Sequence, residues 1–244
     1  MLSQKVENAA QVINKEMSSE EEVFKTLKSI CFNFCLKRFS LAIFFGKKEI
    51  TESFYFYSTC PLKWETHYKK NKYYLADPIF NSLQKVAMPF EWDIKNFKDL
   101  FPFQQELMKH ANDFGIKSGI TIPLLPRPTF HGFFTIFNQA SLHPDVMYTL
   151  SLAANVCTEK IIGIKKSKFL EKLTKREREV LAQKSQGLTV KQISYNLDIS
   201  PPSIAFHLMN IRKKLGVQTS EQAVSKFLMH VNYSSSKILT VPSA

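Results

Sequence analysis

The chain has 244 residues and a formal net charge of +12, so it is long enough for two domains of ordinary size and basic enough to favour an acidic partner. A membrane partner needs an amphipathic helix with a dense Lys and Arg face or an anchor, and the sequence contains no apolar run of about 18 residues. At the N-terminus, Glu7 and Glu16 stand in a segment without an apolar core. We therefore expect no signal peptide, no membrane attachment and a cytoplasmic protein.

Residues 1–164 show helix and strand patterns that predict one domain. Apolar residues at helical spacing predict helices at 4–17, 19–37, 62–72, 77–86, 100–113 and 142–164, and apolar alternation predicts strands at 39–46, 50–58, 87–92, 117–125 and 131–138. The stretches 39–58 and 117–138 each predict a hairpin, which favours an antiparallel sheet. Helices on both faces of five strands predict an α/β (α+β) fold, a three-layer α-β-α sandwich with a five-stranded antiparallel sheet.

The four cysteines predict neither a disulfide framework nor a metal site. Cys31 and Cys35 lie one helical turn apart in a predicted apolar helix, where buried thiols behave as small hydrophobic groups. The sequence has no CxxC pair and no His and Cys spacing typical of zinc. We expect the protein to use no cofactor.

Aromatic residues are abundant in this first domain. The chain has 21 Phe residues, and many of them lie between residues 24 and 137 together with both Trp residues. An aromatic-rich core accounts for this composition, and so does a small-molecule pocket, because pockets are lined by aromatic side chains with a few convergent polar groups.

The segment that follows Cys60 favours the pocket. Trp64 and Tyr68 are four residues apart, so their indole N–H and phenol O–H point from one face of a helix. Asp77 follows just ahead of Pro78 at the next predicted helix start. Taken alone, Asp77 is also explained as a helix N-cap.

Over roughly residues 20–160 the chain resembles the acyl-homoserine-lactone-binding domain of the LuxR family. The resemblance is carried by six positions in order: Trp64, Tyr68, Asp77, Pro78, Trp92 and Gly119. An acyl-homoserine lactone has two carbonyl acceptors, one amide N–H donor and a hydrocarbon tail, and each polar group needs a partner once it is buried. The resemblance implies that Trp64 donates to the ring carbonyl, Tyr68 donates to the acyl carbonyl, and Asp77 accepts the amide N–H.

The resemblance also implies further ligand contacts. Trp92 would form a wall of the lactone site, with Phe101 and Phe103 as additional walls, and Thr135 would add a hydroxyl near the amide or a 3-substituent. Cys60 stands where several members of the family carry a Tyr that helps to bind the amide side, so one hydrogen bond is missing or replaced. The expected ligand-binding set is Trp64, Tyr68, Asp77, Trp92, Thr135, Cys60, Phe101 and Phe103.

The remainder of the chain predicts a short basic linker at 165–172, an all-α four-helix domain with a helix-turn-helix at 173–231, and a flexible tail at 232–244. Three helix starts have a hydroxyl residue followed three positions later by Glu or Gln, which is the signature of a capping box. The three pairs are Thr174 with Glu177, Thr189 with Gln192, and Thr219 with Gln222.

The third helix of this domain is the candidate recognition helix. It follows a helix at Lys175–Ser185 that ends at Gly187, a second helix at Val190–Leu197, and a turn that ends at Ser200. Ser200 is expected to cap the third helix, with Pro201 as its first residue. Its apolar positions would pack on the first two helices: Ile204, Leu208, Ile211 and Leu215 on Val180, Leu181, Ile193 and Leu197.

The charge distribution agrees with a nucleic-acid partner at this end of the chain. From Lys165 onward lie 14 of the 33 Lys and Arg residues but only 5 of the 21 Asp and Glu residues. Taken alone, Lys213 and Lys214 are explained equally well as a solvated helix face, but the helix-turn-helix context favours contact with phosphates. Helix capping and helix termination account for Glu177 and Gly187 without any contact to DNA.

Residues 173–224 resemble the DNA-binding domain of the LuxR family along their whole length. The matching positions are Glu177, Leu181, Gly187, Ile193, Leu197, Ser200, His207, Asn210, Ile211, Lys214, Leu215 and Val217. The residues expected to contact DNA are Lys191, Ser203, Ala205, Phe206, His207, Asn210, Arg212, Lys213 and Lys214. The chain departs from the family at Ala205, Phe206 and Met209, where polar or basic residues are frequent. Contact with thymine methyl groups and a packing role both remain open for these three.

The two resemblances together imply a transcriptional regulator that binds an acyl-homoserine lactone and, as a homodimer, a palindromic site in double-stranded DNA. An orphan regulator that responds to another small molecule, or acts without one, is the alternative in the same class. An enzyme acting on the lactone is the alternative in another class, since Cys60 and His67 lie near the expected site. No base with an orienting partner surrounds them in the sequence, so we expect no enzyme.

Overall fold

The computed structural model describes residues 2–45, 53–82, 87–125 and 130–231. The chain divides into two compact units, Met1–Lys160 and Ile161–Ala244. Among the described helices none is long and apolar enough to cross a membrane.

The first unit is built on a five-stranded sheet with the strand order β2-β1-β5-β4-β3, in which every neighbouring pair is antiparallel. The strands are β1 (Phe39–Phe45), β2 (Ser53–Ser58), β3 (Phe90–Asp93), β4 (Ser118–Pro123) and β5 (Phe130–Phe137). The antiparallel sheet and both predicted hairpins, β1 with β2 and β4 with β5, are confirmed.

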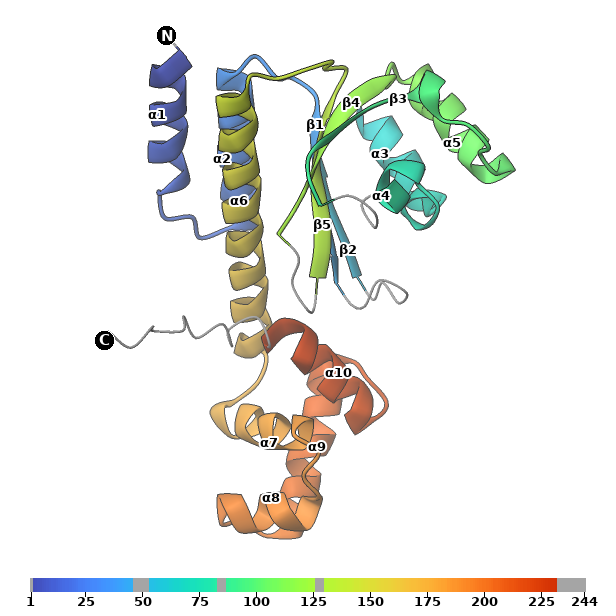
Figure 1. The fold of residues 1–244 in the computed structure, drawn as a ribbon. Coiled ribbons are helices and arrows are strands. Elements are labelled where there is room, and N and C mark those ends of the chain that lie inside the picture. The colour runs from blue at the N-terminus through green and yellow to red at the C-terminus, as the bar shows by residue number, and fades with distance from the viewer. Residues whose placement is uncertain (1, 46–52, 83–86, 126–129, 232–244) are drawn as a thin grey trace, which may run out of the picture. The chain divides into compact units, whose positions relative to one another are not determined.

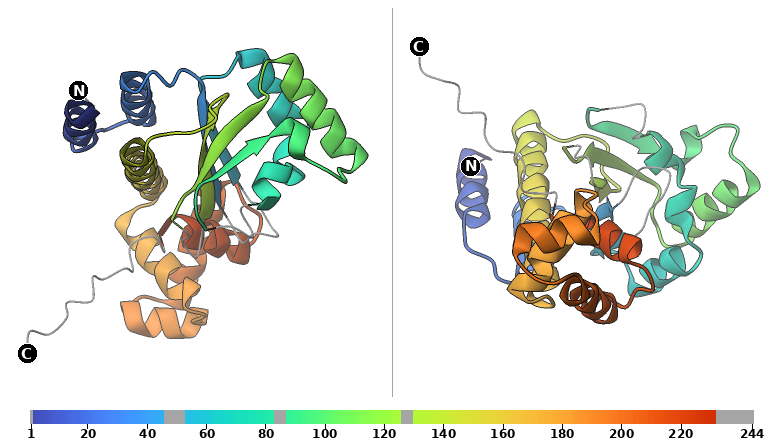
Figure 2. Two further views of the ribbon diagram at one scale, coloured as in Figure 1. Left: turned by 45° about the horizontal axis from the view of Figure 1, so that its top comes forward. Right: turned by 90° about the horizontal axis from the view of Figure 1, so that it is seen from below.

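Helices cover both faces of this sheet. One face is covered by α2 (Glu20–Asn33) and the first part of α6 (Pro144–Glu171), and α1 (Leu2–Ile13) packs on α2 from the outside (Figure 1). The other face carries α3 (Leu62–Lys70), α4 (Pro78–Ser82) and α5 (Pro102–Asp113), and Figure 2 shows the same layers from two further directions. Two short 3-10 turns, η1 (Tyr73–Leu75) and η2 (Ile94–Asn96), complete the unit. The three-layer sandwich is therefore confirmed.

Alternation along the strands divides the core into two halves. On β1, Leu41 and Ile43 point to the α2 and α6 side and are fully buried, whereas Ala42 and Phe44 join a cluster with Phe80 of α4 on the other side. Ser40 lies on the same face of β1 as Ala42 and Phe44. Its hydroxyl therefore faces the side of the sheet that α3, α4 and α5 cover.

The predicted end of the helix at 19–37 and the predicted burial of Cys35 differ from the structure. The helix predicted at 19–37 ends at Asn33, because Phe34 closes it with a backbone N–H bond to Cys31 and the next residue, Cys35, has a φ of 63°. Cys35 is therefore exposed and not a buried helical thiol, whereas Cys31 is buried as expected. The second predicted strand begins at residue 50 and the helix at 77–86 ends at residue 86, and both of those ends lie outside the described residues.

The second unit contains α7 (Lys175–Ser185), α8 (Val190–Leu197), α9 (Pro201–Leu215) and α10 (Ser220–Val231), which confirms the four predicted helices. All three expected capping boxes are formed, and the hydroxyl of Ser200 accepts the N–H of Ser203 at the start of α9. The buried core matches the predicted one and includes Val180, Leu181 and Ile193 under Ile204, Leu208 and Ile211.

The segment predicted as a linker is helical. Helix α6 does not end at residue 164 but continues to Glu171. Phe169 and Leu173 are buried in the core of the second unit, and the ring of Phe169 stacks on His230 with centroids 4.4 Å apart. The basic residues of this segment suggested a solvated connection, but it contains no Pro or Gly after Gly163 to end the helix.

Candidate effector pocket and nucleic-acid interface

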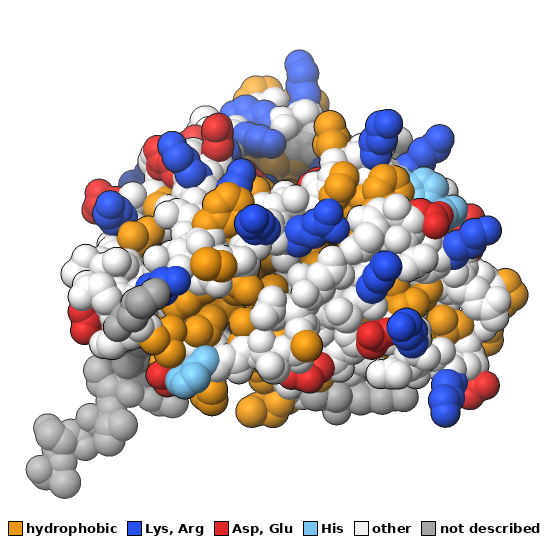
Figure 3. Space-filling model, turned by 90° about the horizontal axis from the view of Figure 1, so that it is seen from above, with side chains coloured by type: hydrophobic (Ala, Val, Ile, Leu, Met, Phe, Trp, Pro, Cys, Tyr) orange, Lys and Arg blue, Asp and Glu red, His pale blue; other side chains and the backbone are white. Residues whose placement is uncertain are grey.

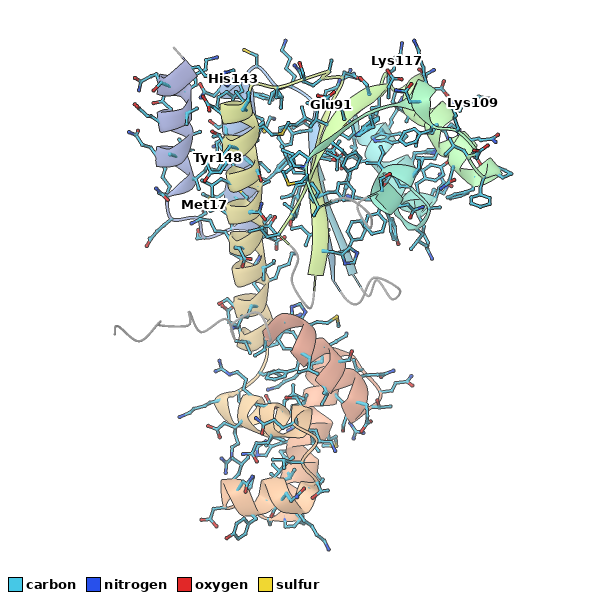
Figure 4. The ribbon with its side chains drawn as sticks, viewed as in Figure 1. Met17, Glu91, Lys109, Lys117, His143 and Tyr148 are labelled. Atoms are coloured by element: carbon cyan, nitrogen blue, oxygen red, sulfur yellow. The ribbon has the colours of Figure 1, made fainter. Side chains whose placement is uncertain are left out.

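A small cavity of about 40 Å³ lies between the sheet and the helices α3 and α5 of the first unit. The side chains of these helices and of the facing strands fill the layer around it, beside strand β3 with the labelled Glu91 and helix α5 with the labelled Lys109 (Figure 4). Its lining is largely aromatic and aliphatic, and it contains Ser40, Phe56, Trp64, Tyr68, Asp77, Ile79, Trp92, Ile94, Leu107, Met108, Ala111, Ile116, Phe133, Thr135 and Phe137. Five of the predicted ligand-binding residues, Trp64, Tyr68, Asp77, Trp92 and Thr135, therefore meet in one place.

Asp77 and Tyr68 form the polar centre of this cavity. The hydroxyl of Tyr68 donates to Asp77 Oδ2 at 2.8 Å, and the backbone N–H of Ile79 donates to Asp77 Oδ1 at 2.8 Å. Burial raises the pKa of Asp77 above its ordinary value, because these neutral donors offset only part of the lost hydration. Burial also raises the pKa of Tyr68, and the neighbouring Asp77 adds to the effect. No cationic side chain in the described ranges pairs with this carboxylate, which favours a further N–H donor.

Trp64 presents its indole to the same cavity. Helix α3 places it one turn before Tyr68, with ring centroids 5.6 Å apart, and it also packs against Phe114 at 5.7 Å. Within the described part of the chain, no residue accepts a hydrogen bond from its indole N–H. This donor is available to an acceptor in the cavity.

A row of hydroxyl groups crosses the sheet at the bottom of the cavity. Thr135 of β5 pairs with Ser40 of β1 on one side and with Thr121 of β4 on the other. The hydroxyls of Thr121 and Thr135 share a hydrogen bond of 2.9 Å, and the indole N–H of Trp92 donates to Thr121 Oγ1 at 3.0 Å. The sequence interpretation missed Thr121 and Ser40, although pairing in the 117–138 hairpin and strand alternation would have indicated Thr121 opposite Thr135.

Gly119 makes room for Trp92. A Cβ at this position would lie 2.5 Å from the backbone oxygen of Ile136 and 2.7 Å from the Trp92 ring. The absence of a side chain at Gly119 therefore lets the Trp92 ring and the backbone of β5 approach β4 closely. Two of the six positions that carried the resemblance are explained by this one contact.

Three predicted ligand contacts do not line the cavity. Phe101 is the N-cap residue of α5 and is 74% exposed, and Phe103 is 40% exposed and packs on Tyr73 with centroids 5.0 Å apart. The inward face of α5 is instead formed by Leu107, Met108 and Ala111, at the spacing of one helix face. Cys60 is buried beside Trp64 in the surrounding hydrophobic cluster but outside the lining.

The surroundings of Cys60 and His67 do not favour nucleophilic catalysis. Burial raises the pKa of the Cys60 thiol, which disfavours the reactive thiolate. His67 Nε2 lies 2.8 Å from His110 Nδ1, so this imidazole is engaged with another histidine and not with the thiol. No group of three or more His, Cys, Asp or Glu side chains in the described ranges is arranged to hold a metal ion.

In the second unit, α9 presents its polar and basic side to an open groove that begins at the N-terminus of α7. The groove is lined by Thr174, Glu177, Phe206, His207, Asn210, Lys213 and Lys214. Of the other predicted DNA contacts, Lys191 and Ala205 are exposed, Arg212 is half-buried, and the hydroxyl of Ser203 is hydrogen-bonded to Ser200 at 2.8 Å.

Glu177 and Lys214 form an ion pair inside this groove that the sequence did not indicate. Lys214 Nζ lies 2.7 Å from Glu177 Oε2, and the same carboxylate oxygen accepts the backbone N–H of Thr174 at 2.8 Å. Burial opposes ionisation of Glu177, but the hydrogen bonds from Lys214 and Thr174 outweigh it and lower its pKa. The ion pair of Lys214 with Glu177 therefore links α9 to α7, in addition to any role of Lys214 in binding phosphate.

These two sites define the class of the protein: a sensor unit with an aromatic effector cavity, followed by a helix-turn-helix DNA-binding unit. Residues 19–161 match the autoinducer binding domain family, and residues 171–227 match the luxR family of bacterial regulatory proteins. The chain belongs to the LuxR family of autoinducer-binding transcriptional regulators. Relatives that match the chain are transcriptional activators, and the family that matches the first unit is named for binding an autoinducer.

Individual relatives are distant in sequence. The chain is 27% identical over 181 residues to the transcriptional activator protein AhyR of Aeromonas hydrophila, which covers 70% of each chain. It is 25% identical over 177 residues to the transcriptional activator protein LuxR of Aliivibrio fischeri, which covers 69% of this chain and 71% of that one. The crystal structure of Escherichia coli SdiA has a TM-score of 0.66 at 20% identity and covers 94% of this chain and 97% of that chain. The shared fold therefore spans both units.

Proposed function

We propose that this regulator binds an acyl-homoserine lactone in the cavity of its sensor unit and binds operator DNA as a homodimer. The observation that carries the proposal is the buried Asp77 carboxylate, which two neutral donors hold at the wall of an aromatic cavity. An amide N–H is a neutral donor that such a carboxylate accepts in a charge-assisted hydrogen bond.

The remaining polar groups of the lactone match the donors around Asp77. The free indole N–H of Trp64 suits the ring carbonyl, and the hydroxyl of Tyr68 suits the acyl carbonyl once the ligand amide takes its place on Asp77. Thr135 and Ser40 present hydroxyls from the sheet, beside the path of the acyl chain or a 3-substituent. Each polar group of the ligand that loses its water on binding thereby finds a hydrogen-bond partner in the protein.

The size of the cavity implies that binding rearranges its walls. A cavity of about 40 Å³ is smaller than the cavity of about 150 Å³ that holds one benzene molecule in another protein, and a lactone with its acyl chain is larger than benzene. The aromatic side chains must therefore open, and the acyl chain then fills the space, at roughly 0.8 kcal/mol for each buried methylene. In this mechanism the ligand completes the hydrophobic core of the sensor and stabilises the folded regulator.

Dimerisation follows from the size of the DNA-binding unit. A single helix-turn-helix unit buries too little DNA surface for tight specific binding, so two copies on half-sites about one helical turn apart are expected. The exposed apolar side of α6 suits such a dimer contact, since Tyr148 (Figure 4) is 73% exposed and Leu152, one turn later, is 46% exposed. The face in Figure 3 shows Lys and Arg side chains scattered among Asp and Glu. We place phosphate binding in the second unit because 14 Lys and Arg residues but only 5 Asp and Glu residues lie from Lys165 onward.

The experiment is a thermal melt of the full chain with acyl-homoserine lactones of different acyl length. At about 100 times the dissociation constant, the proper ligand stabilises the protein by about 2.7 kcal/mol. The shift should be lost in Asp77→Ala and kept in Asp113→Ala, whose carboxylate is exposed at the end of α5. A shift that survives Asp77→Ala contradicts this assignment.

A second candidate is a different acylated ligand in the same cavity. The family resemblance puts Cys60 where several members carry a Tyr, which implies one polar contact fewer on the amide side. A structure of SdiA in complex with octanoyl-rac-glycerol has a TM-score of 0.65 to this chain, at 20% identity and over 94% of it. The same melts with octanoylglycerol discriminate the two, because a glycerol ester has no N–H for Asp77.

A further inference from the structure

The outward side of α9 is apolar at its centre. Ile204 and Leu208 are buried, and Phe206 lies midway between them in sequence, so it points away from the core at 3.6 residues per turn. Phe206 is 57% exposed, Met209 is 49% exposed, and Ala205 is also exposed. These side chains therefore do not pack inside the second unit, and a packing role does not explain them.

The surroundings of this apolar patch are positively charged. Lys213 lies two turns after Phe206 on the same side of α9, and Phe206, Asn210 and Lys213 line one groove. Residues 199–220 contain no Asp or Glu. Exposed apolar side chains in this setting fit a partner that is anionic at its edges and apolar at the point of contact.

The major groove of DNA has this chemistry. Phosphates line its edges, and the C5 methyl group of each thymine is the apolar feature of its floor. A recognition helix reads base edges mainly with its N-terminal part, where Ala205 and Phe206 lie, and Met209 lies one turn after Ala205, near the centre of α9. Lys213, toward the C-terminal end, suits the phosphates that position the helix without carrying sequence information.

We propose that Phe206 and Met209 are specificity-determining residues that contact thymine C5 methyl groups in each operator half-site. The inference rests on the operator binding proposed above and specifies which base the helix selects at its centre. Such contacts discriminate thymine from cytosine by apolar burial, whereas Asn210 remains free to hydrogen-bond with a neighbouring base. The operator of this regulator therefore differs from sites read by relatives with polar residues at these positions.

The test removes only the C5 methyl group of single thymines in the operator. Full-length protein, with the lactone that gives the largest thermal shift or alone if none does, is used to select duplexes from a random library. Each thymine of the selected site is then replaced in turn by deoxyuridine, and the dissociation constant is measured at one fixed salt concentration. We expect one or two positions in each half-site at which the replacement weakens binding about fourfold, the effect of one buried methyl-sized group.

Variants assign those positions to side chains. Phe206→Ala should weaken binding to the thymine duplex and abolish the penalty of deoxyuridine at its position, and Met209→Ala should do so at a neighbouring one. Tyr195→Ala, which removes an 89% exposed aromatic ring from α8, should keep every deoxyuridine penalty. Lys213→Ala should weaken all duplexes alike and also keep the penalties.

Three outcomes separate the inference from the function on which it rests. Selection of no duplex contradicts operator binding itself. Selection of an operator with no position sensitive to deoxyuridine overturns the thymine contact and leaves operator binding intact. A penalty that persists unchanged in both Phe206→Ala and Met209→Ala assigns the thymine contact to other residues and also overturns the proposal.

Discussion

The two units each bury a carboxylate, and the two are treated in opposite ways. Asp77 in the sensor receives hydrogen bonds from neutral groups, which include the Tyr68 hydroxyl and the Ile79 backbone N–H, and burial raises its pKa. Glu177 in the DNA-binding unit receives Lys214 and the N–H of Thr174, and its pKa is lowered. The carboxylate that joins two helices has a cation beside it, whereas the one that we propose binds the ligand is buried at a free-energy cost.

A substitution in the row of hydroxyl groups at the bottom of the cavity is expected to have the largest effect on the free energy of unfolding. Thr121→Val removes the acceptor of the buried Trp92 indole N–H without changing the shape of the side chain. A buried donor left without a partner costs about 1 to 3 kcal/mol, so we expect a loss near the middle of this range in urea unfolding of the sensor. Thr149→Val serves as the control, since its hydroxyl bonds only within α6. Equal losses in the two variants would contradict the role of Thr121.

Removing the charge of Glu177 should destabilise the second unit. Glu177→Gln weakens the ion pair with Lys214, and because that lysine is 38% exposed the loss is screened to roughly 1 to 2 kcal/mol. Glu179→Gln is the matched control, because its pair with Arg176 lies at the surface, and about 0.5 kcal/mol or less is expected there. Hydrogen exchange of the α7 and α9 amides measures the loss of stability in both variants. An unchanged stability in Glu177→Gln would show that this carboxylate does not stabilise the unit.

Removing the charge of Asp77 should raise the stability of the sensor, whereas removing the charge of Glu177 should lower the stability of the second unit. Asp77→Asn replaces a carboxylate that has no cation by a neutral amide of the same shape, so the sensor without ligand should become more stable, by up to about 1 kcal/mol. The same substitution should reduce the lactone-induced thermal shift. Lower stability in the absence of lactone would contradict the view that the charge is costly.

The pH dependence of the two units should also differ. Asp77 has a raised pKa in the folded protein, so it binds protons more readily when folded, and the sensor gains stability as the pH falls through that raised pKa toward the ordinary value of about 3.9. Glu177 has a lowered pKa, so its contribution is present above about 4.3 and is lost as the pH falls further. Hydrogen exchange measured separately in the two units, in wild type and in Asp77→Asn, resolves the two trends.

Periodicity was sufficient to predict the helices, the strands and both hairpins, because each depends on residues close in sequence. The shared face of Trp64 and Tyr68 was predicted for the same reason. The ion pair between Glu177 and Lys214 spans 37 positions, and no local pattern indicates it. Phe101 and Phe103 do not line the cavity, because the start of α5 faces solvent. Residues 165–171, predicted as a linker, are helical, and Phe169 is buried among core residues that are distant in the sequence.

The central claim is that Asp77 keeps an uncompensated charge for the amide N–H of the effector. It is tested most directly by comparing an acyl-homoserine lactone with its ester analogue, in which an oxygen replaces the amide N–H, by calorimetric titration of wild type and Asp77→Ala. A charged hydrogen bond contributes about 1.5 to 3 kcal/mol, so wild type should prefer the amide by roughly 10-fold to 150-fold. In Asp77→Ala the preference should nearly vanish. Equal affinity of wild type for the two ligands would contradict the account.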